Sequence, residues 1–150
     1  IVTRSFSKIY ALAGTRIGYG IANKDLISKL NNKRQPFNVN LVAQAMAKAS
    51  LKDSKFLERS LITYNSSRSY LYEQLDKLSL KYIDSYANFI TIYFGKNVKR
   101  VFNELLKNGI ILRPLENYGL QNYLRMTIGT NRECRKLIKI LKNILRVSNV

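Results

Sequence analysis

The stretch "SFSKIYALAGTRIGYG" (residues 5–20) gathers hydroxyls, one lysine, small residues and one arginine between two runs that are typical of strands. The first run, residues 1–4, is largely β-branched. The second, "RIGYGIAN" (16–23), alternates apolar residues with glycines, which predicts a buried strand that another backbone or a ligand approaches closely. The polar residues therefore lie in a turn between strands, either as a solvated turn or as a site.

Lys8 is the residue in this stretch that could act on a carbonyl group. A lysine becomes nucleophilic when burial or nearby positive charge destabilises its ammonium, and Arg16 follows Lys8 by eight residues. Ser5, Ser7 and Arg16 offer the hydroxyl donors and the guanidinium fork that bind a phosphate ester. Gly14 lets the backbone turn close to such a group. A lysine that forms a Schiff base beside a phosphate cradle is the arrangement that pyridoxal phosphate enzymes need.

Composition bounds the function only loosely. The chain has 150 residues, 46% of them hydrophobic, which suffices for one core or for a core shared between two subdomains. Its formal net charge is +17, from 26 Lys and Arg against 9 Asp and Glu. This excess favours polyanions, anionic membranes or phosphorylated small molecules, whereas a bias toward Lys, Asn, Ile and Tyr produces it without any selected partner.

Several classes of site are excluded. Cys134 is the only cysteine, so the chain has no internal disulfide, and a lone thiol is typical of a reducing, cytoplasmic setting. Without histidine there is no Ser-His or Cys-His pair, and no residues have metal-ligand spacing. No run approaches the roughly 20 apolar residues of a membrane span, and the start is not a signal peptide. The chain opens on Ile1 inside a strand pattern, from which we expect the C-terminal part of a longer protein.

The remaining patterns predict the order β-β-α-α, a long helix, then β-α-β-β-α. The predicted helices cover 24–33, 38–51, 54–80, 98–108 and 131 to about 147. The predicted strands cover 1–4, 16–23, 88–94, 110–114 and 123–130. Within the second helix, Leu41, Ala45 and Ala49 are expected to form the packed face. Thr130 and Glu133 are expected to form a capping box before the last helix.

The opening stretch resembles the cofactor-lysine motif of class I/II aminotransferases of fold type I, S/T-x-S-K-x-x-x-L-A-G-x-R-x-G-Y. The matching residues are Ser5, Ser7, Lys8, Leu12, Ala13, Gly14, Arg16, Gly18 and Tyr19. The resemblance implies that Lys8 bonds pyridoxal 5′-phosphate and later moves a proton, and that Ser5, Ser7 and Arg16 hold the cofactor phosphate. Thr15 stands where a hydrophobic residue is common, a departure that does not touch this chemistry.

The far end of the chain is similar to the histidinol-phosphate aminotransferase branch of that family. "GIILRPLENYGLQNYLRMTIGTNRE" (109–133) contains the branch's I-x-x-R-P and L-R-x-T-x-G-T segments. The resemblance implies that Arg125 binds the amino-acid carboxylate and that Arg113 contacts the substrate's other anionic group. The two residues can equally be surface arginines on strands. Asn88 opens the family's small-domain strand and is expected to have a structural role first.

The resemblance covers the whole chain but less than half of a family member. It implies an α/β fold, the C-terminal part of a fold type I enzyme. Residues 1–53 would belong to the cofactor-binding large domain, 54–80 to a connecting helix and 81–150 to a small α+β domain. The implied reaction is transamination of histidinol phosphate with 2-oxoglutarate in histidine biosynthesis, by a cytoplasmic homodimer. We expect neither a nucleic-acid nor a membrane partner.

Three alternatives stay open. An aromatic aminotransferase or a related decarboxylase shares much of the pattern. The chain could also be a truncated relic that acts as a basic module binding anions or nucleic acid. The family's pyridinium-pairing aspartate, its ring-stacking aromatic, its phenol-binding tyrosine and its glycine-rich phosphate loop precede the lysine and are not in these 150 residues. We therefore expect the isolated chain not to catalyse transamination.

Overall fold

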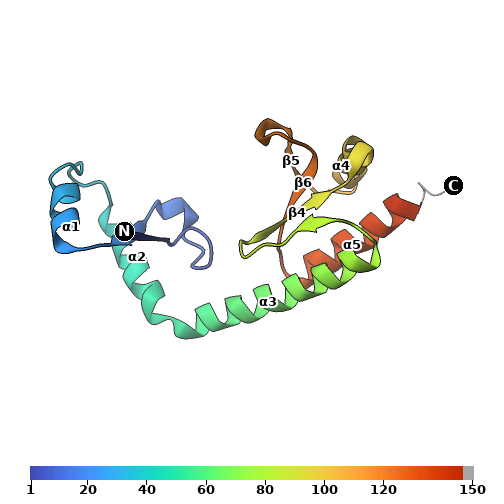
Figure 1. Cartoon of the computed structure of the whole chain (residues 1–150). Coiled ribbons are helices and arrows are strands. Elements are labelled where there is room, and N and C mark those ends of the chain that lie inside the picture. The colour runs from blue at the N-terminus through green and yellow to red at the C-terminus, as the bar shows by residue number, and fades with distance from the viewer. Residues whose placement is uncertain (147–150) are drawn as a thin grey trace. The chain divides into compact units, whose positions relative to one another are not determined.

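The chain forms two compact units, Ile1–Leu61 and Ile62–Val150, in a computed structural model that describes residues 1–146 (Figure 1). Both units mix helices with antiparallel strands, which agrees with the α/β class expected from the sequence. The predicted end of the last helix, near Val147, lies outside the described residues.

The first unit is built on a two-stranded antiparallel sheet. Its elements are β1 (Val2–Ser5), the 3-10 turn η1 (Ala13–Thr15), β2 (Gly18–Ile21), α1 (Lys24–Asn31), α2 (Leu41–Lys52) and the start of α3 (Ser54–Lys77). Asn23 caps α1, because its side chain accepts a hydrogen bond from the Leu26 backbone N–H at 2.9 Å. The helices and strands expected in this half of the chain are all present.

The prediction that β2 is buried is wrong for the described chain. All four residues of β2 are exposed, because the sheet has only two strands and no described element covers them. The expected close approach at its glycines is confirmed. A Cβ atom on Gly18 would lie 2.6 Å from the Arg4 carbonyl oxygen, so a side chain there would push the two strands apart.

The face predicted for α2 is also wrong. The helix buries Ala43 and Ala47, whereas Leu41 is 81% exposed. The run is apolar on nearly every side, so its periodicity does not identify one buried face. The packing of the unit determines which face is buried. Asn40, whose side chain accepts from the Ala43 N–H at 2.7 Å, begins the helix.

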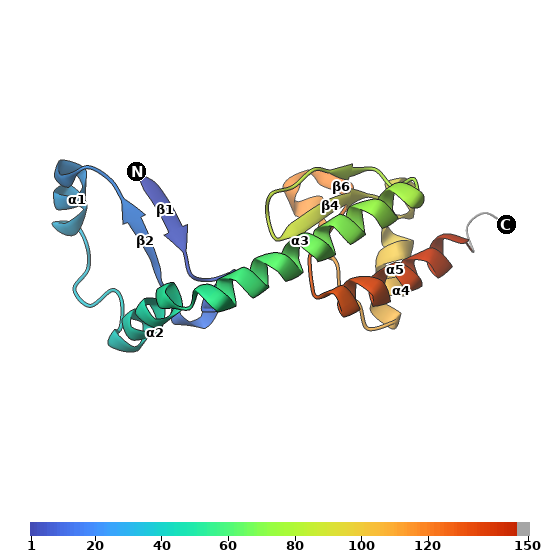
Figure 2. The same ribbon diagram turned by 90° about the horizontal axis from the view of Figure 1, so that it is seen from below.

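The second unit packs three helices on one face of a four-stranded antiparallel sheet, and α3 and α5 lie side by side (Figures 1 and 2). The strand order is β3-β4-β6-β5. These strands are β3 (Tyr82–Ile83), β4 (Phe89–Tyr93), β5 (Arg113–Leu115) and β6 (Leu120–Thr127). The other elements are α4 (Val98–Lys107), α5 (Asn131–Arg146) and the 3-10 turns η2 (Gly95–Asn97) and η3 (Glu116–Tyr118). Only β3 was not predicted, because two residues are too few to show a strand period.

The core of this unit lies between the helices and one face of the sheet. Ile90 and Ile92 of β4 and Leu124 and Met126 of β6 point into it. The apolar side of α5 faces this core, since Leu137, Ile138, Leu141 and Ile144 are buried and Leu145 packs against the core. Because side chains alternate along a strand, the intervening residues of β4 and β6 occupy the opposite face of the sheet.

The capping box at the start of α5 is confirmed. The backbone N–H and the hydroxyl of Thr130 donate to the Glu133 carboxylate at 2.8 and 2.7 Å, and the Glu133 N–H donates back to the hydroxyl at 3.4 Å. These hydrogen bonds, first the one from the backbone and then the one from the side chain, hold the pKa of Glu133 below its ordinary value.

Replacing Thr130 with alanine is expected to lower the free energy of unfolding by about 1 kcal/mol at pH 7. Since the pKa of Glu133 is depressed in the folded state, the box stabilises the fold above the ordinary carboxyl pKa of about 4.3, and this contribution is lost as the pH falls. Urea unfolding at pH 7 and pH 3 should show the cost shrinking in acid. Lys139→Ala, on the exposed side of α5, is the control. A cost that is equal at both pH values would contradict the assignment.

Candidate functional site

The residues predicted to hold a cofactor lie in one loop of the first unit. Ser5 ends β1 and is the register partner of Gly18, where β2 begins. Ser7 and Lys8 follow Ser5, and Arg16 stands two residues before Gly18. The two ends of the loop therefore meet at the end of the two-stranded sheet, with the serines on one side and the arginine on the other.

Local hydrogen bonds shape this loop. The Ser5 hydroxyl accepts from the Ser7 backbone N–H at 3.0 Å. Arg16 has a left-handed backbone with φ of 55°, which is uncommon for a residue other than glycine, and its Nη1 donates to the Ala13 carbonyl at 2.8 Å. No other hydrogen bond or ion pair of Arg16 is found among residues 1–146, so most of its guanidinium donors face no protein acceptor.

Phe6 anchors the loop, and the sequence interpretation missed it. Its side chain is 3% exposed and contacts the rings of Tyr10 and Tyr19, with centroid distances of 5.0 and 5.7 Å. Its backbone N–H donates to the Ile17 carbonyl at 3.2 Å, which closes the loop across its neck. The alternation of Phe6 with the polar residues at 5 and 7 was the available signal, since alternate residues of an extended chain face opposite ways.

The loop suits an anion. Residues 1–24 contain four basic residues and no acidic one, so an incoming phosphate meets no like charge within this segment. Lys8 is exposed, so of the two activating conditions considered from the sequence, burial is not met within the first unit. The loop thus contains one primary amine, two serine hydroxyls and one guanidinium.

The two arginines predicted to bind a substrate are direct neighbours in the second unit. Arg113 of β5 and Arg125 of β6 are cross-strand register partners, so their side chains leave the same face of the sheet, opposite the core. Like charges placed directly opposite each other repel, and neither arginine pairs with a carboxylate among residues 1–146. Two unpaired guanidiniums on one open sheet face can bind a dianion or two carboxylates.

Each guanidinium lies against an aromatic ring. The Arg125 guanidinium is 4.9 Å from the centroid of the Phe89 ring, and the Arg113 guanidinium is 5.5 Å from that of Tyr118. Arg113 also donates from Nη2 to the Tyr118 hydroxyl at 2.9 Å. Such contacts orient a cation without neutralising it, as an anion site requires. Phe89 and Tyr118 were not singled out from the sequence, where only the register could have linked them to the arginines.

Asn88 precedes β4 and makes its backbone contact outside this arginine cluster. Its backbone carbonyl accepts from the Ile128 N–H at 2.9 Å, which extends the pairing of β4 with β6 beyond the strand ends. This contact fits the structural role expected for Asn88.

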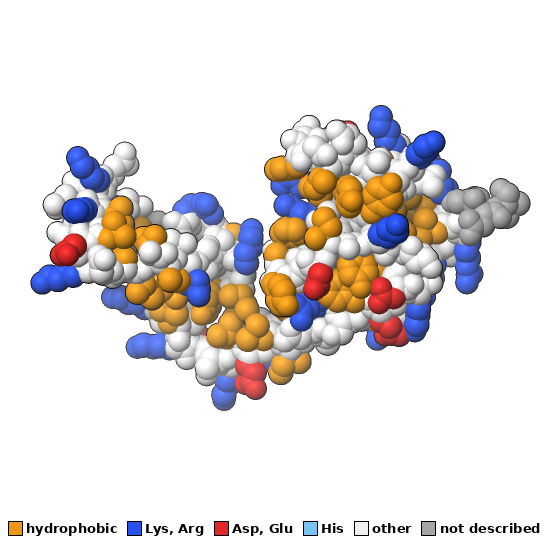
Figure 3. All heavy atoms as spheres, viewed as in Figure 1, with side chains coloured by type: hydrophobic (Ala, Val, Ile, Leu, Met, Phe, Trp, Pro, Cys, Tyr) orange, Lys and Arg blue, Asp and Glu red, His pale blue; other side chains and the backbone are white. Residues whose placement is uncertain are grey.

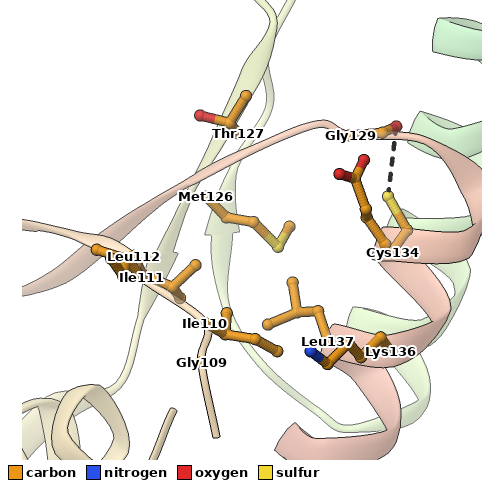
Figure 4. A pocket seen from close by; sticks show the side chains of 11 residues that line it. Gly109, Ile110, Ile111, Leu112, Met126, Thr127, Gly129, Cys134, Lys136 and Leu137 are labelled. Carbon is orange, nitrogen blue, oxygen red and sulfur yellow. Dashed lines mark hydrogen bonds between the residues drawn. The ribbon is translucent and has the colours of Figure 1, made fainter. Parts of the chain in front are cut away.

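A separate cavity of about 450 Å³ in the second unit contains none of the predicted site residues (Figure 4). Ile110, Leu112, Met126 and Leu137 line it, and Cys134 lies at its α5 side with Sγ donating to the Gly129 carbonyl at 3.6 Å. Burial raises the pKa of the Cys134 thiol, which keeps the thiol protonated and poorly reactive at neutral pH. The cavity is thus lined mainly by apolar side chains, with Thr127, Glu133 and Lys136 also in its wall, and its cysteine is not an activated nucleophile.

A sequence profile described as "Aminotransferase class I and II" matches residues 1–141. The chain belongs to this aminotransferase family. Among its relatives, the histidinol-phosphate aminotransferase of Moorella thermoacetica is 44% identical over 145 residues, which are 97% of this chain and 38% of that protein. The histidinol-phosphate aminotransferase of Methylobacillus flagellatus is 40% identical over 146 residues, 97% of this chain and 39% of that protein.

Solved structures agree with the fold expected for the family. The histidinol-phosphate aminotransferase from Clostridium acetobutylicum superposes with a TM-score of 0.86 at 30% identity, covering 95% of this chain and 44% of that one. The enzyme from Sinorhizobium meliloti, solved in complex with pyridoxal-5′-phosphate, gives a TM-score of 0.82 at 26% identity, covering 97% and 41%. This aminotransferase chain thus spans about 40% of the length of the relatives it matches.

Within residues 1–146, no three His, Cys, Asp or Glu side chains gather as a metal site would require. No helix in the same range is long and apolar enough to cross a membrane.

Proposed function

We propose that this chain forms part of a pyridoxal 5′-phosphate-dependent aminotransferase that acts on histidinol phosphate, with the glutamate and 2-oxoglutarate pair. The observation that carries the proposal is that Arg113 and Arg125 are cross-strand neighbours. Neither forms a salt bridge with a carboxylate among the described residues. The names of the relatives support the choice of substrate.

The residues of the first unit fit the cofactor. Pyridoxal 5′-phosphate has an aldehyde for an amine and a phosphate for hydroxyl and guanidinium donors, and the loop from Ser5 to Arg16 contains both kinds of group. When bound, the cofactor withdraws electrons from the substrate α-carbon. In our assignment Ser5, Ser7 and Arg16 bind the phosphate. The Lys8 Nζ would hold the aldehyde carbon and, once displaced by the substrate amine, would take the proton from the substrate α-carbon and move it to another carbon centre.

The arginine pair suits both substrates of the proposed reaction. Histidinol phosphate carries one phosphate dianion, and glutamate and 2-oxoglutarate each carry two carboxylates. We assign Arg125 to the amino-acid carboxylate and Arg113 to the second anionic group. A phosphate can bridge both guanidiniums, whose strands place them opposite each other. One anion-binding face thus accepts each substrate in turn.

The wider setting of the enzyme follows the family. We propose a cytoplasmic homodimer in histidine biosynthesis, with residues 1–53 in the cofactor domain, 54–80 in a connecting helix and 81–150 in a small domain. We also propose that the 150 residues alone do not turn over histidinol phosphate. Steady release of glutamate by the purified chain with both substrates and cofactor, lost in Lys8→Ala, would contradict this last point.

A basic nucleic-acid-binding module is the competing function. The lysines and arginines are spread over the visible surface of each unit (Figure 3), which is typical of a general charge excess rather than of one binding track. The test of the arginine pair below separates the two functions, since a module that binds through general charge depends on neither arginine.

Arg113→Gln and Arg125→Gln are each expected to weaken binding of histidinol phosphate to the full chain by about tenfold or more, because each removes a charge-assisted hydrogen-bond donor. Isothermal titration calorimetry with histidinol phosphate, and with histidinol as the ligand without the phosphate, measures this loss. The double variant should lose less than the sum of the two free-energy changes, since both guanidiniums contact one ligand. Arg132→Gln, exposed on α5, is the control. Equal binding by all variants would overturn the proposed site.

A further inference from the structure

Tyr118 is held beside Arg113 by a short turn. The turn η3 ends at Tyr118, and Gly119 follows in the left-handed conformation with φ of 75°. The Gly119 N–H donates to the Glu116 carbonyl at 3.0 Å and closes the turn. A residue with a Cβ is disfavoured at that φ, so the glycine defines where the chain turns after Tyr118.

The hydroxyl of Tyr118 acts as a hydrogen-bond acceptor but not as a donor among the described residues. Its oxygen accepts the hydrogen bond from Arg113 Nη2 at 2.9 Å, and the ring lies 5.5 Å from the same guanidinium. A phenol has one O–H donor in addition to its acceptor lone pairs. Among residues 1–146 no acceptor for the Tyr118 proton is found, and the side chain is 62% exposed. The O–H therefore remains available at the edge of the arginine pair.

We propose that Tyr118 is a third ligand of the anion site, which accepts a hydrogen bond from Arg113 and donates its own O–H to the bound phosphate. This inference rests on the proposed function and deepens it. The arrangement is chemically consistent, because the arginine donates to the phenol oxygen while the phenol proton points to a different acceptor. An anion also strengthens a chain of donors that runs toward it.

The third donor favours phosphate over carboxylates. A phosphomonoester presents three terminal oxygens on one phosphorus atom and can accept from both arginines and the phenol together. A dicarboxylate divides its charge between two distant groups, one for each arginine, and leaves no oxygen that requires the phenol. The two arginines alone would bind a phosphomonoester or a dicarboxylate. Tyr118 adds selectivity for the phosphorylated substrate.

The test is Tyr118→Phe in the full chain, because phenylalanine keeps the ring beneath Arg113 and removes only the hydroxyl. Calorimetry should show about a tenfold loss of affinity for histidinol phosphate and less than a threefold change for glutarate, a dicarboxylate probe. The Arg113 and Arg125 Nε–H resonances in NMR spectra report whether the pair itself is undisturbed. Tyr86→Phe is the matched control, since Tyr86 is 93% exposed.

Each other outcome is decisive. Unchanged histidinol phosphate binding in Tyr118→Phe, with a loss in Arg113→Gln, overturns the role of Tyr118 and leaves the proposed function standing. Equal losses for histidinol phosphate and glutarate overturn direct donation, since they show that Tyr118 acts only by placing Arg113. Insensitivity of binding to both arginines overturns the proposed function, and the inference with it.

Discussion

Lys8→Ala is expected to abolish the main site at which pyridoxal 5′-phosphate becomes attached to this chain. The exposed amine of Lys8 lies in the loop that also presents Ser5, Ser7 and Arg16, in a segment, residues 1–24, that contains no acidic residue. Binding of the phosphate raises the effective concentration of the aldehyde beside Lys8. Incubation with the cofactor, borohydride reduction and peptide mass mapping should therefore find the adduct on Lys8 first.

Two further variants make this result specific. Arg16→Gln keeps the lysine and removes a phosphate donor, so labelling of Lys8 should fall several-fold while labelling elsewhere stays constant. Lys24→Ala removes an exposed lysine at the start of α1 and should leave the Lys8 adduct intact. Adducts spread evenly over all lysines in the unmodified chain would show that the loop does not recognise the phosphate.

Leu124→Ala is expected to lower the free energy of unfolding of the second unit by about 3 kcal/mol. Leu124 is fully buried in the middle of β6, opposite Ile92 of β4 and Pro114 of β5. Its truncation removes buried apolar contacts and leaves a cavity between sheet and helices. Because β6 also carries Arg125, binding of histidinol phosphate should be lost at the urea concentration that unfolds the strand.

The matched control for this prediction is Ile111→Ala. Ile111 is 78% exposed, so its truncation should change the unfolding free energy by less than about 0.5 kcal/mol. Urea unfolding followed by far-ultraviolet circular dichroism measures both variants. Similar costs at the two positions would mean that β6 is not the centre of the core.

The secondary structure was largely predictable because its signals are local. Asn23 and the capping box of Thr130 and Glu133 mark helix starts through hydrogen bonds to backbone groups within one turn. Gly109, with φ of 72°, follows the end of α4 in the left-handed conformation that glycine favours after a helix. The apolar stripe of α5 was equally clear, since its polar and apolar residues separate cleanly around the helix.

The wrong predictions concern properties that depend on contacts between two or more elements, such as which face of a helix is buried. The alanine-rich α2 is apolar on nearly every side, so its periodicity does not show which face is buried. Packing within the unit buries Ala43 and Ala47 instead of the predicted face. The burial of β2 was inferred from its own composition, whereas burial depends on what covers a strand. The two residues of β3 became visible only as partners of Ile92 and Thr91 in the sheet.

By itself, the sequence determined the contents of the lysine loop, the element types and the presence of two arginines on strands of one subdomain. Those properties depend on residue chemistry and on spacing within short segments. Only the tertiary structure decided that Arg113 and Arg125 stand opposite each other, with Phe89 and Tyr118 against them. Strand register is set by hydrogen bonds and core packing between distant segments, and a one-residue shift would send one arginine to the buried face.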